Sequence, residues 1–273
     1  MTTKVNTEKE EEDKNEIAPK SADEIAVSSP DEIAPLGAVV GDFGTEDMTF
    51  PKFQFAQGVG PLSDRYPKGA VVLEGECQIA EMGGDPLEIT VLRMEKSYEE
   101  NVPYGGDEMP RLASTKDEVY AMGGTLAATK DENGNRIPAT WKPVATTFIC
   151  IKMPDAPTKP KDDKDEEAML KYKTELANHS NMSQWFPYGH MDEDGDETFY
   201  AFAEWKIRGV AYYRAADYIN TAARTYLRSG LLFGSFNLFS DKAVFNGNTV
   251  AVPKIVRGAP NNRDLVNWLA EFI

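Results

Sequence analysis

The sequence predicts a mainly β protein, either an OB-like barrel or a related small β fold, with helices added to it. Three observations lead to this fold class. Short runs rich in β-branched and aromatic residues recur along the chain, and turns that contain glycine or proline separate them. An Asn-Gly pair, the commonest signal for a two-residue hairpin, lies between the last two runs. One amphipathic helix pattern precedes that pair.

The strands are expected after residue 69. Four strand-like runs precede the hairpin: Ala70–Ile79, Leu87–Met94, Val144–Met153 and Phe199–Ile207. The turn sequence Gly83-Gly84-Asp85-Pro86 separates the first two, and residues 131–134 (Asp-Glu-Asn-Gly) form another turn. We expect residues 209–213 to extend the fourth strand. Asn246-Gly247 then joins the last two strands as a tight hairpin.

Two helices are predicted in the C-terminal part of the chain. Arg214–Arg228 carries its apolar residues on one face, and Ser229-Gly230 supplies a stop. Its outer face ends in arginines, at the end of a helix where the dipole favours cations. Arg263–Phe272 forms a short final helix, for which Asn262 is the expected N-cap.

The chain divides by composition into an acidic arm, residues 1–48, and a β-rich domain, residues 49–273. Residues 1–50 contain 13 Asp and Glu against 4 Lys, and the tripeptide Glu-Ile-Ala recurs at Glu16, Glu24 and Glu32. Such a short period buries too little apolar surface to offset the ordering of the backbone. We therefore expect the arm to be disordered and to act as a docking segment or as a competitor for a basic groove.

A second acidic segment, about residues 155–197, is predicted as an insertion in the β-rich domain. It opens with a linker of Pro, Lys and Asp and continues with a helix over about Glu166–His179. The segment closes with residues 190–197 (His-Met-Asp-Glu-Asp-Gly-Asp-Glu). A calcium loop is disfavoured there because Gly195 comes too early for the sixth position of an EF-hand, so an acidic hairpin turn is expected.

Most enzyme classes and a membrane span are excluded by what the sequence lacks. Gly58-Val59-Gly60-Pro61 lacks the rest of a dinucleotide-binding loop, and no phosphate-binding Gly-Lys-Ser/Thr occurs. His179 and His190 are expected to be solvated, and Cys77 and Cys150 to be buried core residues. We therefore expect no catalysis, no cofactor and no metal. The chain has neither a long apolar run nor an N-terminal apolar region, which predicts an intracellular, cytoplasmic protein.

The charge reverses in the C-terminal part of this acidic chain. The whole chain carries −16, but residues 206–263 contain nine Lys and Arg against Asp217 and Asp241. Aromatic residues alternate with these cations, and a positive groove with aromatic faces is what binds single-stranded nucleic acid. Strand alternation places Lys206 and Arg208 on the face opposite Trp205 and Ile207.

The candidate DNA-binding residues follow from this pattern. The alternative is that the arginines are simply solvated on the outer face of the helix and that the aromatic residues belong to the core. The cations expected to neutralise phosphates are Lys206, Arg208, Arg214, Arg224, Arg228 and Arg257. The aromatic residues proposed as stacking platforms are Phe53, Trp141, Tyr212 and Tyr213.

Residues 50–213 resemble the single-stranded DNA-binding-like proteins that are common in phage genomes. The resemblance begins with Pro51, Phe53, Phe55 and Gln57-Gly58, followed by a Pro67-Lys68-Gly69 turn into a strand. It continues with residues 87–92 (Leu-Glu-Ile-Thr-Val-Leu), with a tyrosine at 98 or 104, and with the aromatic segment 199–213. The acidic arm, the insertion and the apolar C-terminal helix depart from the family pattern.

The resemblance implies a non-catalytic phage-type protein that binds single-stranded DNA with little sequence preference during replication or recombination. The implied compartment is the cytoplasm of the host cell. The implied partners are single-stranded DNA and, through the acidic arm, replication or recombination proteins; a homo-oligomer is left open. Two alternatives remain: a structural or packaged virion protein that uses its acidic segments for assembly, and an acidic DNA mimic that inhibits a host protein.

The acidic arm is expected to compete with DNA. If its charge of about −9 covers the +7 of residues 206–263, a DNA strand must displace it. Deletion of residues 1–48 should then tighten the affinity for single-stranded DNA at low salt, as measured by fluorescence anisotropy. An unchanged affinity would contradict competition by the arm.

Overall fold

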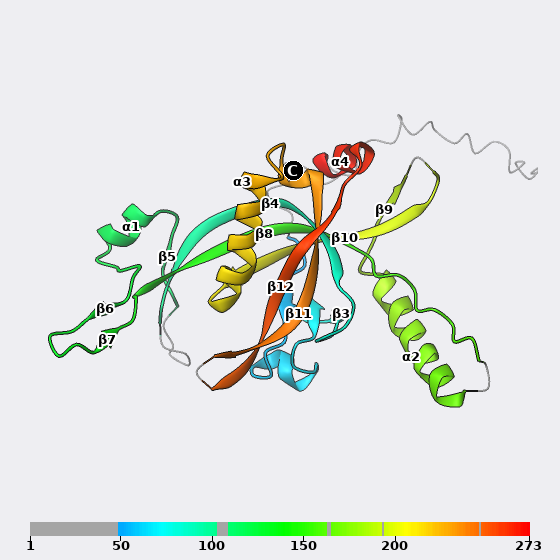
Figure 1. Ribbon diagram of the computed structural model, residues 1–273, viewed down its shortest axis with the longest axis horizontal. Helices are drawn as coiled ribbons and strands as arrows, with labels where there is room; N and C mark the ends of the chain where they lie inside the picture. The colour runs from blue at the N-terminus through cyan, green and yellow to red at the C-terminus, as the bar shows by residue number, and fades with distance from the viewer. Residues whose placement is uncertain (1–48, 103–108, 163–164, 193, 246) are drawn as a thin grey trace, which may run out of the picture. The chain divides into compact units, whose positions relative to one another are not determined.

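The computed structural model describes residues 49–102, 109–162, 165–192, 194–245 and 247–273 (Figure 1). The arm of residues 1–48, Tyr104 and Asn246 lie outside the described residues, so the predictions made for them stay predictions. Thr49–Ile273 forms one structural unit. Within the described residues, no helix is both long and apolar enough to cross a bilayer.

The dominant element is a curled, half-barrel antiparallel sheet, which confirms the expectation of a mainly β protein with added helices. Its strand order is β12-β11-β4-β8-β10-β9, and a short strand, β5, pairs with β4 outside this path. The strands are β4 (Leu87–Glu100), β5 (Leu112–Ala113), β8 (Trp141–Lys152), β9 (Tyr188–Met191), β10 (Glu197–Arg208), β11 (Gly234–Phe245) and β12 (Asn248–Pro260). The two strands that flank residues 246–247 pair as predicted, with Phe245 opposite Asn248.

A three-stranded sheet bridges the two sides of the curled sheet. It consists of β1 (Phe53–Phe55), β2 (Val71–Leu73) and β3 (Cys77–Ala80). An isolated bridge joins Lys52 to Glu204 of β10, and another joins Met82 to Ser240 of β11. The single strand expected over 70–79 is therefore wrong, because Glu74 and Gly75 adopt φ of 48° and 70° and form a turn between β2 and β3.

Helices cover both faces of the curled sheet. The predicted helix 214–228 is present as a π-helical turn, η6 (Tyr212–Ala216), followed by α3 (Asp217–Thr225). The expected strand extension over 209–213 is wrong, because Gly209 adopts φ of 60° and the chain turns into η6. A short 3-10 turn, η7 (Leu231–Phe233), follows α3. The last helix, α4 (Arg263–Ala270), begins as predicted with the Asn262 side chain accepting from the backbone N–H of Leu265 at 2.8 Å.

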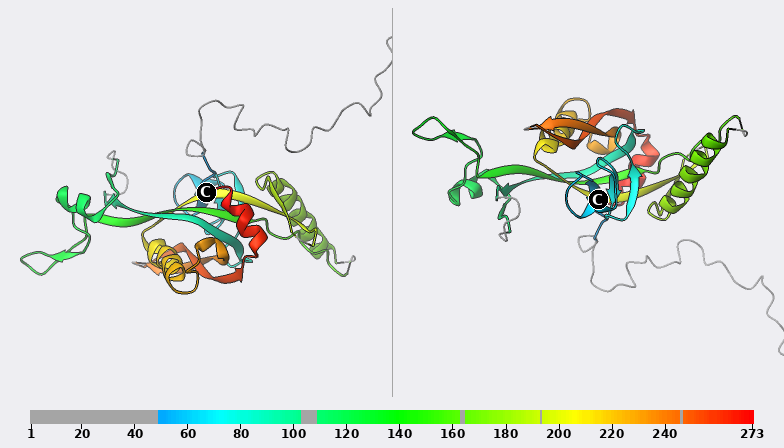
Figure 2. Two further views of the ribbon diagram at one scale, coloured as in Figure 1. Left: turned by 90° about the horizontal axis from the view of Figure 1, so that it is seen from above. Right: turned by 90° about the horizontal axis from the view of Figure 1, so that it is seen from below.

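The two faces of the sheet hold separate cores. Figure 2 shows α3 beside the β11–β12 hairpin, and α3 shares one core with the β1–β3 sheet. The larger core joins strands of both sheets to η6 and α3, whereas a smaller core packs α4 on Phe202 and Cys150. The solvated state expected for His190 is wrong: it is 8% exposed, contacts the Trp268 ring, and its Nε2 lies 3.1 Å from Asp264 Oδ2. The other histidine, His179, is half-buried, and its Nε2 lies 2.9 Å from the carbonyl oxygen of Pro154.

The acidic insertion projects from the body as α2 (Glu166–Ser183), which buries none of its residues. It ends in the β9–β10 hairpin, where Asp192 Oδ1 accepts from the backbone N–H groups of Asp194 and Asp196, as an acidic turn requires. At the opposite end, β4 and β8 extend into a tip that contains α1 (Lys116–Ala121) and the hairpin β6–β7 (Thr129–Lys130 and Arg136–Ile137), whose turn was predicted. Both Cys77 and Cys150 are buried, as expected.

Residues between β1 and β2 fasten the N-terminal strands to the β11–β12 hairpin. The Gln57 amide donates to the backbone carbonyl of Ala251 at 2.9 Å, and its oxygen accepts from the Ala251 N–H at 3.1 Å. The Lys68 ammonium donates to the carbonyl of Thr249. Gly69 adopts φ of 87° and packs so closely on Met82 that a Cβ there would lie 2.3 Å from its side chain. These residues therefore have a structural role.

Candidate nucleic-acid interface

Three cations converge on one buried carboxylate, Glu99 of β4. Lys206 Nζ lies 3.1 Å from Glu99 Oε2, and Arg208 Nη1 lies 3.2 Å from Oε1. Lys142 of β8, which pairs with Glu99 across the sheet, places its Nζ 3.9 Å from Oε1. Trp205 and Ile207 are buried in the core, as the alternation in β10 predicted. We call these three cations the Glu99 cluster.

The electrostatics of this cluster keep Glu99 ionised. Burial alone would raise the pKa of the carboxyl group, but the hydrogen bond and charge of Lys206, with the charges of Arg208 and Lys142, outweigh it and lower the pKa below its ordinary value. The side chains of Lys206 and Arg208 remain 40% and 58% exposed. Part of each positive charge therefore faces solvent and is available to an anionic ligand.

A groove of about 630 Å³ lies beside the Glu99 cluster. Lys52, Lys206 and Arg208 line it, opposed by one acidic residue, Glu204. Its floor is aromatic: the ring centroids of Phe53 and Trp205 are 5.4 Å apart, and those of Phe55 and Trp205 are 6.1 Å apart. Phe55 is half-buried, so this ring presents part of its surface to the groove. The groove combines a basic rim with apolar rings.

A second basic group surrounds the C-terminal end of α3. Arg224 and Arg228 are exposed, and Arg228 Nε donates to the carbonyl of Arg224 at 3.3 Å. Arg257 of β12 places its guanidinium 4.6 Å from the centroid of the Tyr226 ring. This distance is within the range of a cation–π contact. We call Arg224, Arg228, Arg257 and Tyr226 the α3 cluster.

Both clusters border strand β12. The groove is lined by residues 250–253 of this strand, and a smaller pocket next to the α3 cluster is lined by residues 257–260. From Ala251 to Gly258 the strand advances by about 23 Å at a rise of about 3.3 Å per residue. The π-helical turn η6 packs on β12. An extended ligand could therefore contact both clusters while following one strand.

Three of the four proposed stacking platforms are core residues, which corrects the sequence-based assignment. Phe53, Trp141 and Tyr212 are 2%, 1% and 7% exposed, so none offers a free ring face to a base. Trp141 packs on Tyr98 and Val119 in a small core at the tip. Tyr213, in contrast, is 65% exposed, and Arg214 beside it is also exposed. The structure does not bring these two into either cluster.

Sequence reasoning missed several residues of these clusters. Lys52 and Phe55 line the groove beside the Glu99 cluster, but no local pattern in the sequence marks them as groove residues. Glu99 and Lys142 carry no local signal, because only the pairing of β4, β8 and β10 brings them to Lys206 and Arg208.

Within the described part of the chain, no group of three or more His, Cys, Asp or Glu side chains is placed to hold a metal ion. Comparison with protein-family models, with curated proteins and with solved structures finds no match.

Proposed function

We propose that this chain is a non-catalytic protein that binds single-stranded DNA with little sequence preference. The observation that carries the proposal is the groove beside the Glu99 cluster, with lysine and arginine on its rim and the half-buried Phe55 ring on its floor, where Phe55 packs on the buried rings of Phe53 and Trp205. Cations track phosphates, and aromatic rings accept any base through its face. Both features act without reading a base edge, so they favour binding that tolerates any sequence.

A single strand fits this arrangement better than a duplex. The bases of a duplex are stacked and paired, and their faces cannot reach Phe55. Residues that contact only phosphates would bind single-stranded and duplex DNA alike. The apolar floor of the groove adds affinity only for unstacked bases. We therefore attribute the preference for single strands to the aromatic floor of the groove, and the salt dependence of binding to the cations on its rim.

The fold is compatible with an OB-like domain. The curled sheet and the β1–β3 sheet are joined by isolated bridges at Lys52 and Met82, which supports a barrel-like arrangement of the strands. Small barrels of this type bind oligonucleotides on a strand face and its bordering loops. We further propose that the protein acts in phage DNA replication or recombination and that its acidic arm recruits partner proteins.

Fluorescence anisotropy tests this function directly. A labelled 30-residue oligo-dT and a duplex of the same length are titrated with the full chain at low and at physiological salt. We expect preference for the single strand and a log–log salt slope of about −0.7 for each phosphate contact, hence about −3.5 for five cations. Absence of single-strand binding at low salt, for both the full chain and the deletion of residues 1–48, would eliminate this function.

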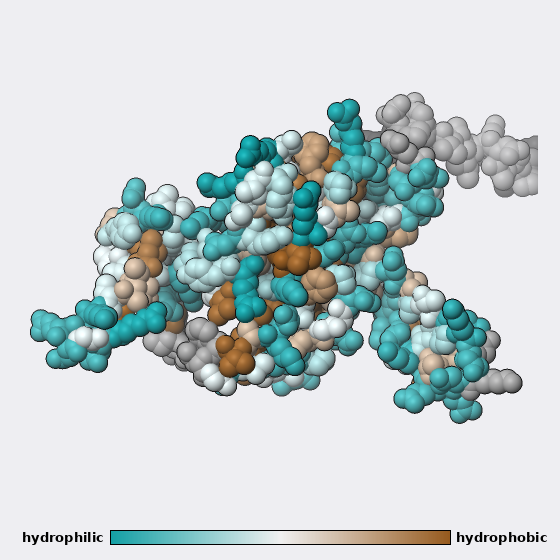
Figure 3. Space-filling model, viewed as in Figure 1, coloured by the Kyte–Doolittle hydropathy of each residue, from teal (hydrophilic) through white to brown (hydrophobic). Residues whose placement is uncertain are grey.

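That negative result would favour a structural protein that uses assembly contacts. Five apolar side chains are exposed around the tip of the long strands, and Figure 3 shows apolar groups on the surface at this end. They are Met109, Leu112, Tyr120, Met122 and Ile137. An exposed apolar group of this kind is typical of an interaction site.

A further inference from the structure

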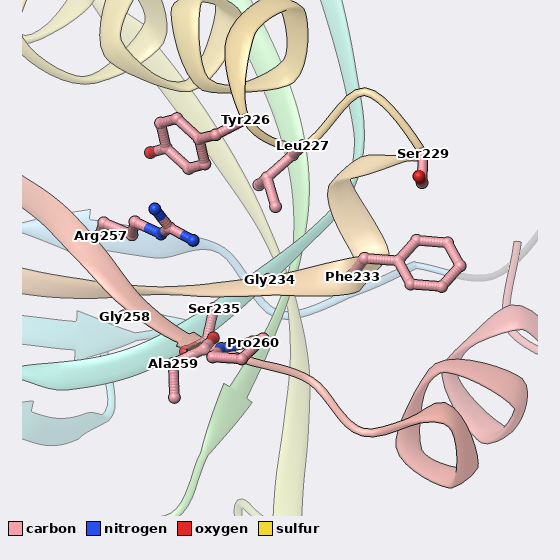
Figure 4. Close-up of a pocket in the computed structure, with 10 residues that line it drawn as sticks. All are labelled: Tyr226, Leu227, Ser229, Phe233, Gly234, Ser235, Arg257, Gly258, Ala259 and Pro260. Carbon is pink, nitrogen blue, oxygen red and sulfur yellow. Dashed lines mark hydrogen bonds between the residues drawn. The ribbon is translucent and has the colours of Figure 1, made fainter.

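A small pocket lies where the C-terminal end of α3 meets the end of β12. Figure 4 shows the Tyr226 ring and the Arg257 guanidinium facing each other at this pocket. Its volume is about 160 Å³, below the range of about 300–1,000 Å³ typical of pockets for drug-sized ligands. Leu227, Phe233, Ala259 and Pro260 supply apolar walls, and Ser229 and Ser235 add hydroxyl groups. The pocket therefore suits a single small ring system.

Arg257 is available to a ligand in this pocket. Among the ion pairs of the described residues, none includes Arg257, and its guanidinium rests on the face of Tyr226. Burial, followed by the hydrogen bond with Tyr218, raises the pKa of Tyr226 to about 12, so this ring stays neutral under the cation. A planar guanidinium fixed on one ring can stack its other face on a second planar group.

The surroundings favour a base over a phosphate in this pocket. Tyr226 is the C-terminal cap residue of α3, and the negative end of the helix dipole there disfavours an anion. The apolar walls would also desolvate a phosphate, with Arg257 as the one cation among the lining residues to compensate its charge. Outside the pocket, Arg224 on the last turn of α3 and Arg228 in the turn after the helix are exposed and can meet the neighbouring phosphates.

We propose that the pocket seats one unstacked nucleobase of the bound strand, stacked on Arg257, with the phosphates on either side near Arg224 and Arg228. This proposal rests on the proposed single-strand binding and adds a base subsite at the second hollow along β12. It also changes the role of Arg257, which the sequence assigned to phosphate neutralisation.

A comparison of two ligands on matched variants tests the base subsite. The ligands are dT10 and a ten-residue strand of abasic deoxyribose phosphates, which has the same charge but no bases. The variants are Arg257→Gln and Tyr226→Leu, with Lys254→Gln as control, because exposed Lys254 packs on Phe239 outside the pocket. Thermal unfolding is measured for each variant.

We expect Arg257→Gln to weaken dT10 binding by about 5- to 150-fold more than it weakens abasic-strand binding, the range for loss of one stacked base. Tyr226→Leu should weaken dT10 binding selectively and leave the salt slope unchanged, because it removes no charge. Lys254→Gln should affect both ligands equally and weakly.

Equal losses on both ligands for Arg257→Gln would overturn the base subsite and leave a phosphate contact. Unchanged binding of both ligands would place the pocket outside the DNA path and would overturn it as well. In either case the wild-type chain still binds dT10. A wild-type chain that fails to bind dT10 would instead overturn the proposed function itself.

Discussion

Replacing Lys206 and Arg208 together by glutamine is expected to weaken oligo-dT binding about 25-fold at 0.1 M salt. Each phosphate contact to a single strand contributes about 0.7 to the magnitude of the salt slope, so two contacts contribute about 1.4 logarithmic units at that concentration. The slope should become shallower by the same 1.4. Anisotropy titrations of the labelled 30-residue oligo-dT between 50 and 200 mM salt measure both quantities.

The double variant also disturbs Glu99, which needs a control. Loss of Lys206 and Arg208 leaves the buried carboxylate with Lys142 alone, at 3.9 Å. A buried charge that loses its partners destabilises a fold, although solvent reaches these partners and reduces the effect. The triple variant Glu99→Gln, Lys206→Gln, Arg208→Gln removes the buried charge as well. We expect it to melt near the wild-type temperature and still to show the shallower slope.

A matched pair of lysines on α2 supplies the second control. Lys171 and Lys173 are both exposed on the projecting helix, far along the chain from either cluster. Their double replacement by glutamine changes the net charge by the same amount. If it lowers the DNA affinity as much as the Lys206 and Arg208 variant does, the binding depends on total charge and the Glu99 cluster has no special role.

Local patterns were sufficient for most of the secondary structure. The β-branched run 144–153 and the amphipathic run 214–228 are long enough to show their periods, and β8 and η6–α3 lie there. The run 70–79 misled because its apolar residues continue through a turn at Glu74 and Gly75. Residues 209–213 were wrongly predicted as a strand extension, because aromatic and β-branched residues also pack well in a helix that covers a sheet.

The site was harder to predict because it depends on strand register. Charge counting identified Lys206 and Arg208, but Arg208 and its partner Glu99 are separated by 109 positions in the sequence. Aromatic content could not distinguish an exposed ring from a buried one, because both faces of the curled sheet are covered by other elements. Phe53 and Trp141 are therefore packed, although nearby Phe55 lines the groove and Lys142 belongs to the Glu99 cluster.

Trp141→Ala is expected to lower the free energy of unfolding by about 3–5 kcal/mol, the usual cost of removing a buried tryptophan. The side chain is 1% exposed and forms the centre of the tip core with Tyr98, Ala113 and Val119. Gly124 approaches its ring so closely that a Cβ there would lie 2.4 Å from it, so the packing leaves little room for relaxation. Chemical denaturation of the wild-type chain and the variant gives the difference.

The same variant separates a core role from a stacking role. Because the tip core is distinct from the larger core, the folded fraction of Trp141→Ala should bind oligo-dT with an unchanged salt slope. Trp141→Phe keeps an aromatic ring and should be less destabilising than the alanine variant. A variant with full stability and strongly reduced affinity would show instead that Trp141 stacks on DNA, as its aromatic character alone had indicated.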